Sequence, residues 1–321
     1  MKVFDLHCDT LSELRYAEKA GAPKSFAEND LHIDLQKLKK GDYMLQCFAA
    51  FVNLGDKTPG ADPLVTALEE IDVFKRIMEK YPEEIAPVYR PSDIRKNAAE
   101  GKISGMLTIE EGGCCKGSLG VLRRLYELGV RMMTLTWNHE NCLAYPHRPA
   151  EFQNKGLKPF GLETVQRMDE LGMVVDVSHL SDAGFWDVVK HGTRPFMATH
   201  SNSREVRNVS RNLSDEMIRA LADRGGIMGL NFYSDFLSDD PVGRIDDMLR
   251  HCRHIMNVGG EQVLGLGTDF DGMETEIEVN GAGEMPKLAQ AMDRAGFSTD
   301  QIEGICYRNA ERFFARYWGE K

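Results

Sequence analysis

The sequence predicts a single (β/α)8 barrel, and two observations support this prediction. Short β-rich runs alternate with segments of helical character along the whole chain of 321 residues. Eight such runs occur, and eight is the number of strands in a closed parallel barrel covered by helices. Barrels of this kind commonly need about 250 residues or more, so we expect one domain over residues 1–321.

The expected strands are short runs rich in β-branched, aromatic and other apolar residues. They lie at residues 2–7, 43–52, 103–110, 130–137, 173–179, 194–200, 226–233 and 262–270. Amphipathic stretches between these runs predict helices. They include residues 64–80, 119–129, 158–172, 181–191, 214–224 and 243–257. The tail from Lys287 to Tyr317 predicts one or two closing helices, with Ser298 or Thr299 as an N-cap.

The main alternative to a closed barrel is an open, doubly wound parallel sheet. Such a sheet usually has a glycine-rich phosphate-binding turn directly after its first strand. The corresponding stretch here, "LHCDTLSEL", contains no glycine. The closed barrel is therefore favoured.

The composition argues against membrane and nucleic-acid partners. Hydrophobic residues make up 42% of the chain, and no apolar stretch approaches the ~20 residues that a membrane span needs. The first residues lack the apolar core of a secretory signal, so we expect mature sequence. The net charge of −11 disfavours nucleic-acid binding, which depends on a basic surface. Whether the chain forms a homodimer is left open.

The seven cysteines predict reduced thiols. Their number is odd, and no two of them have the CxxC spacing of a zinc knuckle or redox centre. Reduced cysteines are typical of cytoplasmic proteins, so we expect a cytoplasmic location.

Polar residues gather at the C-terminal ends of the expected strands, where the chemistry of a (β/α)8 barrel is located. Most of the eight runs end within about two residues of a histidine or a carboxylate. The residues at these ends include His7, Asp9, Glu110, Glu111, Trp137, His139, His179, His200, Tyr233 and Asp269. Burying such charged and imidazole groups together is costly unless something pairs with them, and a bound cation accounts for the whole set.

The spacing of the histidines indicates two metal ions. His7 and Asp9 are two positions apart on an extended chain and point the same way, so they can hold one ion together. His179 and His200 end consecutive strands and suit a second ion. Imidazole and oxygen ligands without thiolates fit Zn²⁺ best, with Mn²⁺, Co²⁺ and Fe²⁺ as alternatives.

A glutamate at the end of the third run stands between these two groups. The two oxygens of its carboxylate can bridge two ions. The alternation of the strand does not decide whether this glutamate is Glu110 or Glu111. Two ions about 3.5–4 Å apart can activate a shared water molecule near neutral pH. Asp269, in "GLGTDFDG", is placed to take a proton from that water and pass it to a leaving group. Asp271 and Gly272 fit a turn.

Three arginines lie in the loop "HSNSREVRNVSRN". Among Arg204, Arg207 and Arg211, one can supply the guanidinium fork that a substrate carboxylate needs. Within the first run, alternation predicts that Asp5 is a buried structural partner of the site and that Cys8 points away from it.

Several motifs follow one another along the chain: "DLHCDT", "EEGG", "SLGVLRRLYELGVRMMTLT", "DVSH", "THSNSR", "SRN" and "GTDFDG". In order and spacing they resemble the membrane dipeptidase, or renal dipeptidase, family of zinc metallopeptidases. The resemblance covers nearly the whole chain. It implies an amidohydrolase-like (β/α)8 barrel with two zinc ions that hydrolyses dipeptides, including those with a C-terminal D-residue.

Carried over residue by residue, the resemblance implies a complete site. The ligands of the two zinc ions correspond to His7 with Asp9 and to His179 with His200. The bridging glutamate of the family directly precedes a Gly-Gly pair, which selects Glu111 in "EEGG". Asp269 matches the acid/base aspartate, and Arg211 matches the arginine that holds the C-terminal carboxylate of the dipeptide.

The chain departs from the family at two places. Animal members have a histidine directly after "TLT" that is thought to steady the tetrahedral intermediate, whereas this chain has Trp137 there and His139 two residues on. A tyrosine associated with the substrate carboxylate is replaced by Phe236, with Tyr233 nearby. We therefore expect Trp137, His139 and Tyr233 to contact substrate.

Two rival functions are less well supported by the sequence. The first is another amidohydrolase-like activity, such as that of a lactonase, amidase, phosphoesterase or deaminase. Many binuclear members of that broader group bridge their metals with a carboxylated lysine at the end of strand four, and "LTLTWNHEN" has no lysine. A metal-binding barrel without catalysis would not need Asp269, which is present together with all the expected ligands.

Overall fold

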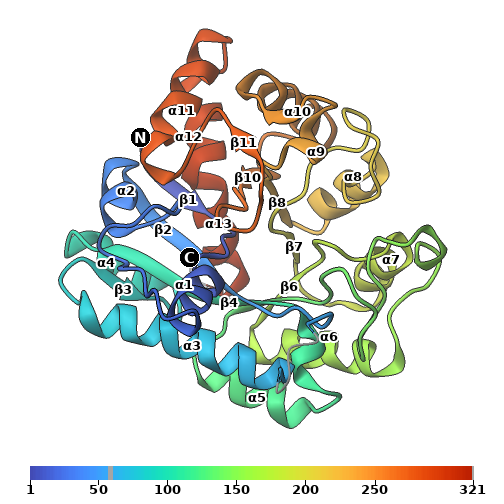
Figure 1. Cartoon of the computed structure of the whole chain (residues 1–321). Coiled ribbons are helices and arrows are strands. Elements are labelled where there is room, and N and C mark those ends of the chain that lie inside the picture. The colour runs from blue at the N-terminus through green and yellow to red at the C-terminus, as the bar shows by residue number, and fades with distance from the viewer. Residues whose placement is uncertain (57–60, 320–321) are drawn as a thin grey trace.

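The computed structural model describes residues 1–56 and 61–319, and it contains the expected barrel. Eight parallel strands form a closed ring (Figure 1). In ring order they are β1 (Val3–Asp5), β2 (Tyr43–Phe51), β4 (Ile103–Glu110), β5 (Met132–Thr134), β6 (Val174–Asp176), β7 (Met197–Ala198), β8 (Ile227–Leu230) and β10 (Leu264–Leu266). β2 pairs with β4, and β10 pairs with β1, which closes the ring. Each predicted run contains one of these strands, so the predicted fold is confirmed.

Three short strands lie outside the ring. β3 (Ile85–Pro87) pairs with the first residues of β4, below the point where β5 begins to pair with that strand. β9 (Val242–Gly243) pairs with β11 (Glu276–Ile277) in a separate two-stranded sheet. None of these three strands changes the topology of the barrel.

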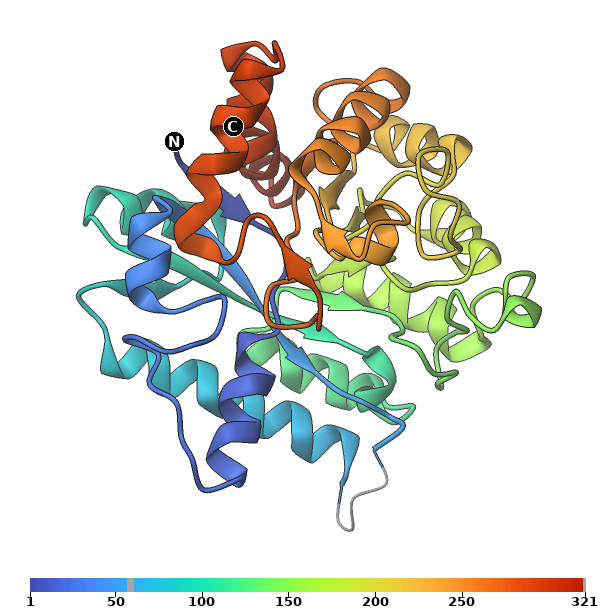
Figure 2. The same ribbon diagram turned by 45° about the horizontal axis from the view of Figure 1, so that its top comes forward.

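Helices surround the ring on the outside (Figure 2). They are α1 (Thr10–Lys19), α2 (Leu35–Lys40), α3 (Pro63–Lys80), α4 (Pro91–Ala99), α5 (Leu119–Glu127), α6 (Pro159–Leu171), α7 (Asp182–His191), α8 (Asp215–Asp223), α9 (Ser234–Leu237), α10 (Ile245–Gly259), α11 (Met285–Arg294), α12 (Thr299–Glu303) and α13 (Asn309–Tyr317). The six helical stretches expected from the sequence correspond to α3, α5, α6, α7, α8 and α10. Within the described ranges, no helix combines the length and the apolar character needed to cross a bilayer.

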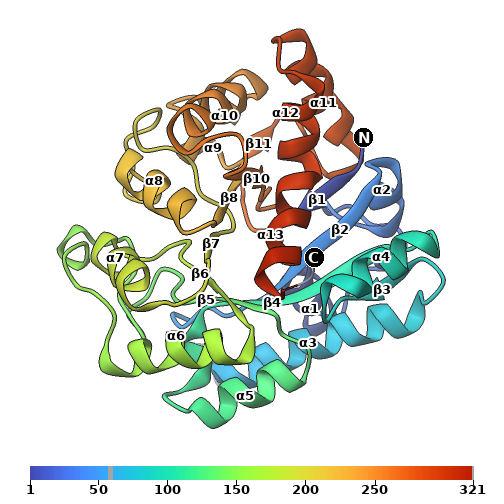
Figure 3. The ribbon, with the colours of Figure 1, turned by 180° about the vertical axis from the view of Figure 1, so that it is seen from behind.

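The closing helices cover the N-terminal end of the barrel. Apolar residues from the strands pack there against α13, and Phe314 stacks on Phe4 with ring centroids 5.5 Å apart. Figure 3, seen from behind, shows α13 lying across this end. Ser298 is the N-cap of α12, because its side chain accepts a hydrogen bond from N of Gln301. The predicted closing helices and the Ser298 alternative for their N-cap are therefore confirmed.

The register of the strands brings polar residues to the opposite end. Glu110 of β4 pairs with Thr134 of β5, and Thr134 pairs with Asp176 of β6. Paired residues of neighbouring strands share a face of the sheet, so these three side chains point to the same side. Their neighbours Ile109, Met133 and Val175 belong to the apolar cluster of the opposite face. The inner face of the barrel is therefore polar near its C-terminal end.

Candidate metal centre and active site

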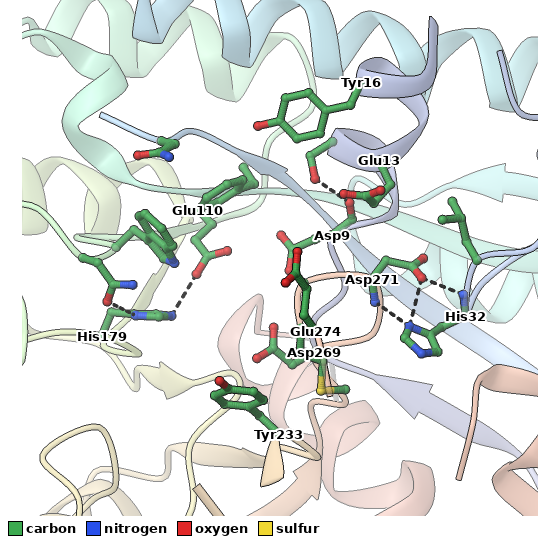
Figure 4. A pocket seen from close by; sticks show the side chains of 18 of the residues that line it. Asp9, Glu13, Tyr16, His32, Glu110, His179, Tyr233, Asp269, Asp271 and Glu274 are labelled. Atoms are coloured by element: carbon green, nitrogen blue, oxygen red, sulfur yellow. Dashed lines mark hydrogen bonds and ion pairs between the residues drawn. The ribbon is translucent and has the colours of Figure 1, made fainter. Parts of the chain in front are cut away.

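Side chains from several strand ends converge around Glu110, the last residue of β4 (Figure 4). Oε2 of Glu110 lies 3.3 Å from Nε2 of His7. Oε1 lies 3.0 Å from Nε2 of His179 and 3.5 Å from Nε2 of His200. The two oxygens of one carboxylate therefore face two different groups of imidazole nitrogens.

Asp9 and Asp269 complete the group around His7. Nε2 of His7 lies 3.4 Å from Oδ2 of Asp9 and 3.9 Å from Oδ1 of Asp269. In the other group, the Nε2 atoms of His179 and His200 are 3.0 Å apart. The rings of His7 and His200 stack with centroids 3.8 Å apart, so the two groups adjoin. The structure thus brings together the residues predicted at five separate strand ends.

The structure corrects the choice between the two glutamates, because Glu110 and not Glu111 lies among the histidines. Glu111 follows the strand in a left-handed conformation, with φ of 90°. Its Oε2 accepts a hydrogen bond from N of Trp137 at 2.8 Å. Its Oε1 accepts hydrogen bonds from N of Gly113 at 2.7 Å and from Nδ2 of Asn141. Both oxygens are therefore occupied by nitrogen donors away from the histidine cluster.

Hydrogen bonds fix how two of the histidines present their nitrogens. Nδ1 of His179 lies 3.2 Å from Oδ1 of Asn138, which can only accept, so Nδ1 carries the proton. Thr199 donates its hydroxyl proton to Asp176 at 2.6 Å, so Oγ1 of Thr199 accepts from Nδ1 of His200 at 2.8 Å. Both Nε2 atoms then have a free lone pair toward Glu110, the arrangement typical of metal-binding histidines.

Burial and crowding shift the pKa values of the cluster. Burial and the neighbouring Asp9 carboxylate raise the pKa of Glu110 to about 8. Burial lowers the pKa values of His179 and His200 well below the ordinary value. Burial also lowers the pKa of His7, but the carboxylates of Asp9 and Glu110 outweigh this effect and raise it well above 6.5 overall. A bound cation favours deprotonated carboxylates and neutral imidazoles, so it would relieve this crowding.

The donor atoms fit a metal ion. Nε2 of His7 and Oδ1 of Asp9 are buried and have no hydrogen-bond partner among the described residues. Two sets of three ligand atoms lie within 4.8 Å of one another: His7 with Glu110 and His200, and His7 with Asp9 and Asp269. Imidazole nitrogens and carboxylate oxygens are the donors that zinc and related transition metals prefer.

Asp269 lies at the edge of the cluster, held by its neighbours. It lies three residues beyond the end of β10 with φ of 63°, and its Oδ2 accepts a hydrogen bond from Nδ2 of Asn231 at 2.9 Å. Its Oδ1 faces His7. Burial raises the pKa of Asp269, and the Asp9 carboxylate adds to this increase. The carboxyl predicted to transfer protons is thus placed beside the candidate metal ligands.

A cavity of about 850 Å³ opens above the cluster. Its lining includes Asp9, Glu110, His179 and Asp269, so the cluster forms part of its wall. Aromatic walls come from Phe51, Trp137, Tyr233 and Phe236. In Figure 4, Asp271 and His32 lie on the far side of Asp9 from Glu110 and His179, and the lining also includes Glu13, Tyr16 and Glu274. The predicted contacts Trp137 and Tyr233 therefore do line the cavity.

Arg211 is buried next to Phe236 of the cavity wall and is not itself one of the lining residues. Its Nη1 donates a hydrogen bond to Oγ of Ser201 at 2.6 Å, and its guanidinium carbon lies 5.5 Å from the centre of the Phe236 ring. Nε and Nη2 are buried without a hydrogen-bond partner in the part of the chain that the structure describes. Burial lowers the pKa of Arg211 to about 10, so the group keeps its charge at neutral pH. Two buried donors of a cation thus require an acceptor.

The structure places His139 outside the cavity lining. His139 is exposed, and its ring lies 5.8 Å from that of Trp137 on the side of Gly55. Besides His179, His147 lines the cavity in this region, and the sequence analysis missed it. Its Nδ1 lies 2.9 Å from Oγ of Ser210, and burial and nearby arginines lower its pKa to about 3. The expectation that His139 contacts substrate is therefore not supported by its position.

Asp271 has more contacts than a turn residue needs. Its carboxylate accepts hydrogen bonds from Oγ1 of Thr10 at 2.7 Å and from N of His32 at 2.6 Å. His32 in turn stacks on Phe270, with ring centroids 5.3 Å apart. This contact ties the segment before α2 to the segment that contains Asp269, and no local sequence signal links positions so far apart. Asp5 behaves as predicted, since it is buried and accepts hydrogen bonds from N and Oγ1 of Thr268.

A closed parallel barrel whose strand ends hold imidazoles and carboxylates defines a class, the metal-dependent hydrolases. Comparison with known proteins specifies the family. The model of the membrane dipeptidase family, peptidase family M19, matches residues 1–317. The chain belongs to this family and is a metal-dependent dipeptidase.

Relatives and solved structures agree with this assignment. An uncharacterized dipeptidase of Schizosaccharomyces pombe is 32% identical, and the alignment covers 98% of this chain and 80% of the relative. A solved metallopeptidase of family M19, the dipeptidase AC, is 25% identical with a TM-score of 0.90, and the match covers 99% of both chains. A metallopeptidase of Rhodobacter sphaeroides, crystallised with a phosphinate mimic of L-Ala-D-Ala, shares the fold, with 24% identity, a TM-score of 0.91 and 99% of both chains covered.

Proposed function

We propose that this dipeptidase works with two zinc ions, one on each side of Glu110. The observation that carries the proposal is that the two carboxylate oxygens of Glu110 face different histidines. Oε2 faces His7, and Oε1 faces His179 and His200. Asp9 would join His7 at one ion, and Glu110 would bridge to the other. Three of the five ligands are imidazoles, which bind zinc better than Mg²⁺ or Ca²⁺. Mn²⁺, Co²⁺ and Fe²⁺ also bind imidazole ligands and are the alternatives to zinc.

The chain's own residues then divide the remaining work. Metal ions bound there supply Lewis acidity and a water molecule of lowered pKa. Asn231 holds Oδ2 of Asp269, which leaves Oδ1 directed toward the cluster. Asp269 can accept a proton at Oδ1 and deliver it to the departing amine of the dipeptide. Its raised pKa favours this exchange, because a strongly acidic carboxyl would hold the proton too weakly.

Arg211 would limit the substrate to dipeptides. A dipeptide has its free carboxylate one residue beyond the scissile bond, and Nε and Nη2 of Arg211 are the buried donors that such a carboxylate can satisfy. Phe236 and Tyr233 stand at the same side of the cavity, where they would enclose the C-terminal residue. Trp137 would cover the cluster from the His179 side, since their rings lie 6.4 Å apart.

The proposal extends to dipeptides with a C-terminal D-residue. The cavity of about 850 Å³ lies within the size range of sites that bind small molecules, which is ample for either configuration of a dipeptide. The Rhodobacter sphaeroides structure was solved with a mimic of an L-D dipeptide. These two observations support the acceptance of dipeptides with a C-terminal D-residue.

The test is metal reconstitution followed by a dipeptide panel. Metal-stripped protein would be loaded with Zn²⁺, Mn²⁺ or Co²⁺, and the bound metal counted by elemental analysis. Hydrolysis of L-Ala-L-Ala, L-Ala-D-Ala and the amidated L-Ala-D-Ala would then be followed. We expect two zinc ions per chain, turnover of both free dipeptides and little turnover of the amide. A single bound ion at full activity would contradict the binuclear centre, and inactivity toward L-Ala-D-Ala would contradict the D-residue proposal.

We also infer a reducing compartment, such as the cytoplasm, from the cysteines. All seven lie within the described residues as free thiols, and all except Cys142 are buried. Burial raises the pKa values of Cys8 and Cys47 well above the ordinary thiol value, which keeps these groups protonated and unreactive. Seven titratable thiols in unfolded, unreduced protein are the expected result, and fewer would contradict the inference.

A further inference from the structure

Glu111 is a buried carboxylate that the proposed hydrolysis does not use. It follows Glu110 directly and is fully buried. Its backbone is left-handed, with φ of 90° and ψ of 84°, a conformation that residues other than glycine adopt rarely. A buried charge on a strained backbone persists only when the surrounding structure holds it there, so its contacts merit a functional explanation.

Besides the hydrogen bond from N of Gly113, the side chain of Glu111 accepts two that both come from one segment, residues 135–144, which follows β5. Oε2 of Glu111 accepts a hydrogen bond from N of Trp137, and Oε1 accepts one from Nδ2 of Asn141. Asn141 in turn closes the segment through hydrogen bonds with main-chain groups of Leu135, Leu143 and Ala144. Glu111 therefore holds this segment near its start and near its end.

The 135–144 segment contacts a candidate metal ligand. Asn138, which follows Trp137, lies with its Oδ1 3.2 Å from Nδ1 of His179. This contact keeps the proton of His179 on Nδ1 and directs Nε2 toward Oε1 of Glu110, 3.0 Å away. The path thus runs from Glu111 through Trp137 and Asn138 to His179.

We propose that Glu111 is a positioning residue for the metal centre, because it holds the 135–144 segment so that Asn138 orients His179. This inference rests on the proposed role of His179 as a metal ligand. Glu111 touches neither substrate nor metal in this scheme. Two successive residues at the end of β4 therefore contribute: Glu110 as a ligand, and Glu111, just past the strand, as the support of the ligand that follows β6.

Glu111→Gln is the first test. Glutamine has the same shape as glutamate, but one of the two carboxylate oxygens is replaced by an amide nitrogen. That nitrogen cannot accept from the N–H donor it would face, so at least one of the hydrogen bonds is lost. We expect metal affinity, measured on the holoenzyme by competition with a chelator, to fall about 10–100-fold, the usual effect of losing the support of a metal ligand. The melting temperature, kcat and KM would be measured on the same samples.

Glu70→Gln is the matched control. Glu70 is also a fully buried glutamate, its Oε1 lies 3.9 Å from Nη1 of Arg15, and it does not line the cavity. We expect this variant to keep the metal affinity and the kcat of the unaltered protein. The comparison separates the loss of a buried carboxylate as such from the loss of the contacts that Glu111 makes.

Asn138→Ala tests the last step of the path and leaves Glu111 intact. We expect a similar loss of metal affinity. We also expect the double variant E111Q/N138A to bind metal as tightly as the single variant of lower affinity, because both substitutions act on the same contact. If Glu111→Gln does not fold, Asn138→Ala decides alone.

The outcomes distinguish the inference from the proposed metal centre. Loss of affinity in both single variants, without additivity, supports the path. Unchanged metal affinity in Asn138→Ala, fully additive losses, or a Glu111→Gln variant that loses only thermal stability would each overturn it. If the unaltered protein binds no metal, the proposed metal centre fails and the inference fails with it.

Discussion

The two ends of the barrel are built from the same strands but from opposite kinds of residue. At the N-terminal end, Phe4, Met106 and Met197 pack in an apolar cluster with Phe314 of α13. At the C-terminal end, the same strands lead into buried acids and imidazoles, and some of their atoms have no hydrogen-bond partner among the described residues. The first arrangement stabilises the fold, whereas the second is costly without a ligand. Stability and chemistry are therefore located at different ends of each strand.

The backbone shows the same contrast. Among the described residues other than glycine, six have a positive φ. Four of them, Glu111, His179, Asp269 and Asp271, surround the candidate site. A left-handed backbone lets a side chain leave the regular alternation of a strand, so strain is concentrated where side chains must converge. We therefore expect mutations at the C-terminal end of the barrel to alter catalysis and mutations at the N-terminal end to alter stability.

The largest effect is expected for Asp269→Asn at the C-terminal end. Asparagine cannot accept and deliver the proton, so kcat should fall about 10²–10⁴-fold, the usual contribution of a general acid or base. The hydrogen bond from Asn231 can be kept, so metal content and melting temperature should stay close to those of the unaltered protein. Steady-state kinetics and elemental analysis check this. High activity with full metal content would move the acid/base role to another residue.

Phe314→Ala should have the opposite effect at the N-terminal end. Phe314 is fully buried and stacks on both Phe4 and Trp318. Removing the ring should lower the free energy of unfolding by about 3–5 kcal/mol, as for other aromatic residues in protein cores. Denaturant unfolding would measure this loss, and kcat/KM per folded molecule should be unchanged. A change in KM for the dipeptide would show that the two ends are coupled.

Arg211→Met should weaken substrate recognition at the C-terminal end. Each hydrogen bond to a charged group contributes about 1.5–3 kcal/mol, so kcat/KM for a free dipeptide should fall by roughly 10–100-fold. The unaltered enzyme should prefer a free dipeptide to its C-terminal amide, and the variant should lose this preference. Kinetics on the matched pair of substrates checks the prediction. An undiminished preference would assign the carboxylate to another cation, such as Arg148 in the cavity wall.

The contrast between the two ends also explains what the sequence could reveal. Each strand and the ligands at its end follow from local patterns, because a strand of period two shows both its core face and its last polar residue. Alternation alone left Glu110 and Glu111 open, and the structure resolves the choice: Leu107 and Ile109 are buried in the cluster beneath the helices, so Thr108 and Glu110 face inward. The choice of Glu111 relied on its distance from a Gly-Gly pair, which says nothing about the face of the strand.

Contacts between loops could not be found in this way. His147 meets Ser210, 63 positions away, and His32 meets Asp271, 239 positions away. Neither pair belongs to a periodic element, so only the folded arrangement of the loops brings the partners together. His139 illustrates the same limit. It is only two residues from Trp137, yet Trp137 lines the cavity and His139 does not.

The smallest effect is expected for Ser298→Ala, which alters only the entry to the closing helices. Oγ of Ser298 accepts from N of Gln301, and Oε1 of Gln301 accepts from N of Ser298, so the two form a capping box. Alanine removes one of these bonds and should lower the free energy of unfolding by about 1 kcal/mol. Ser298→Thr keeps the acceptor and serves as the control. Because α12 and α13 support the N-terminal end, kcat, KM and metal content should all remain unchanged, and a shift in any of them would mean that the closing helices also reach the chemistry.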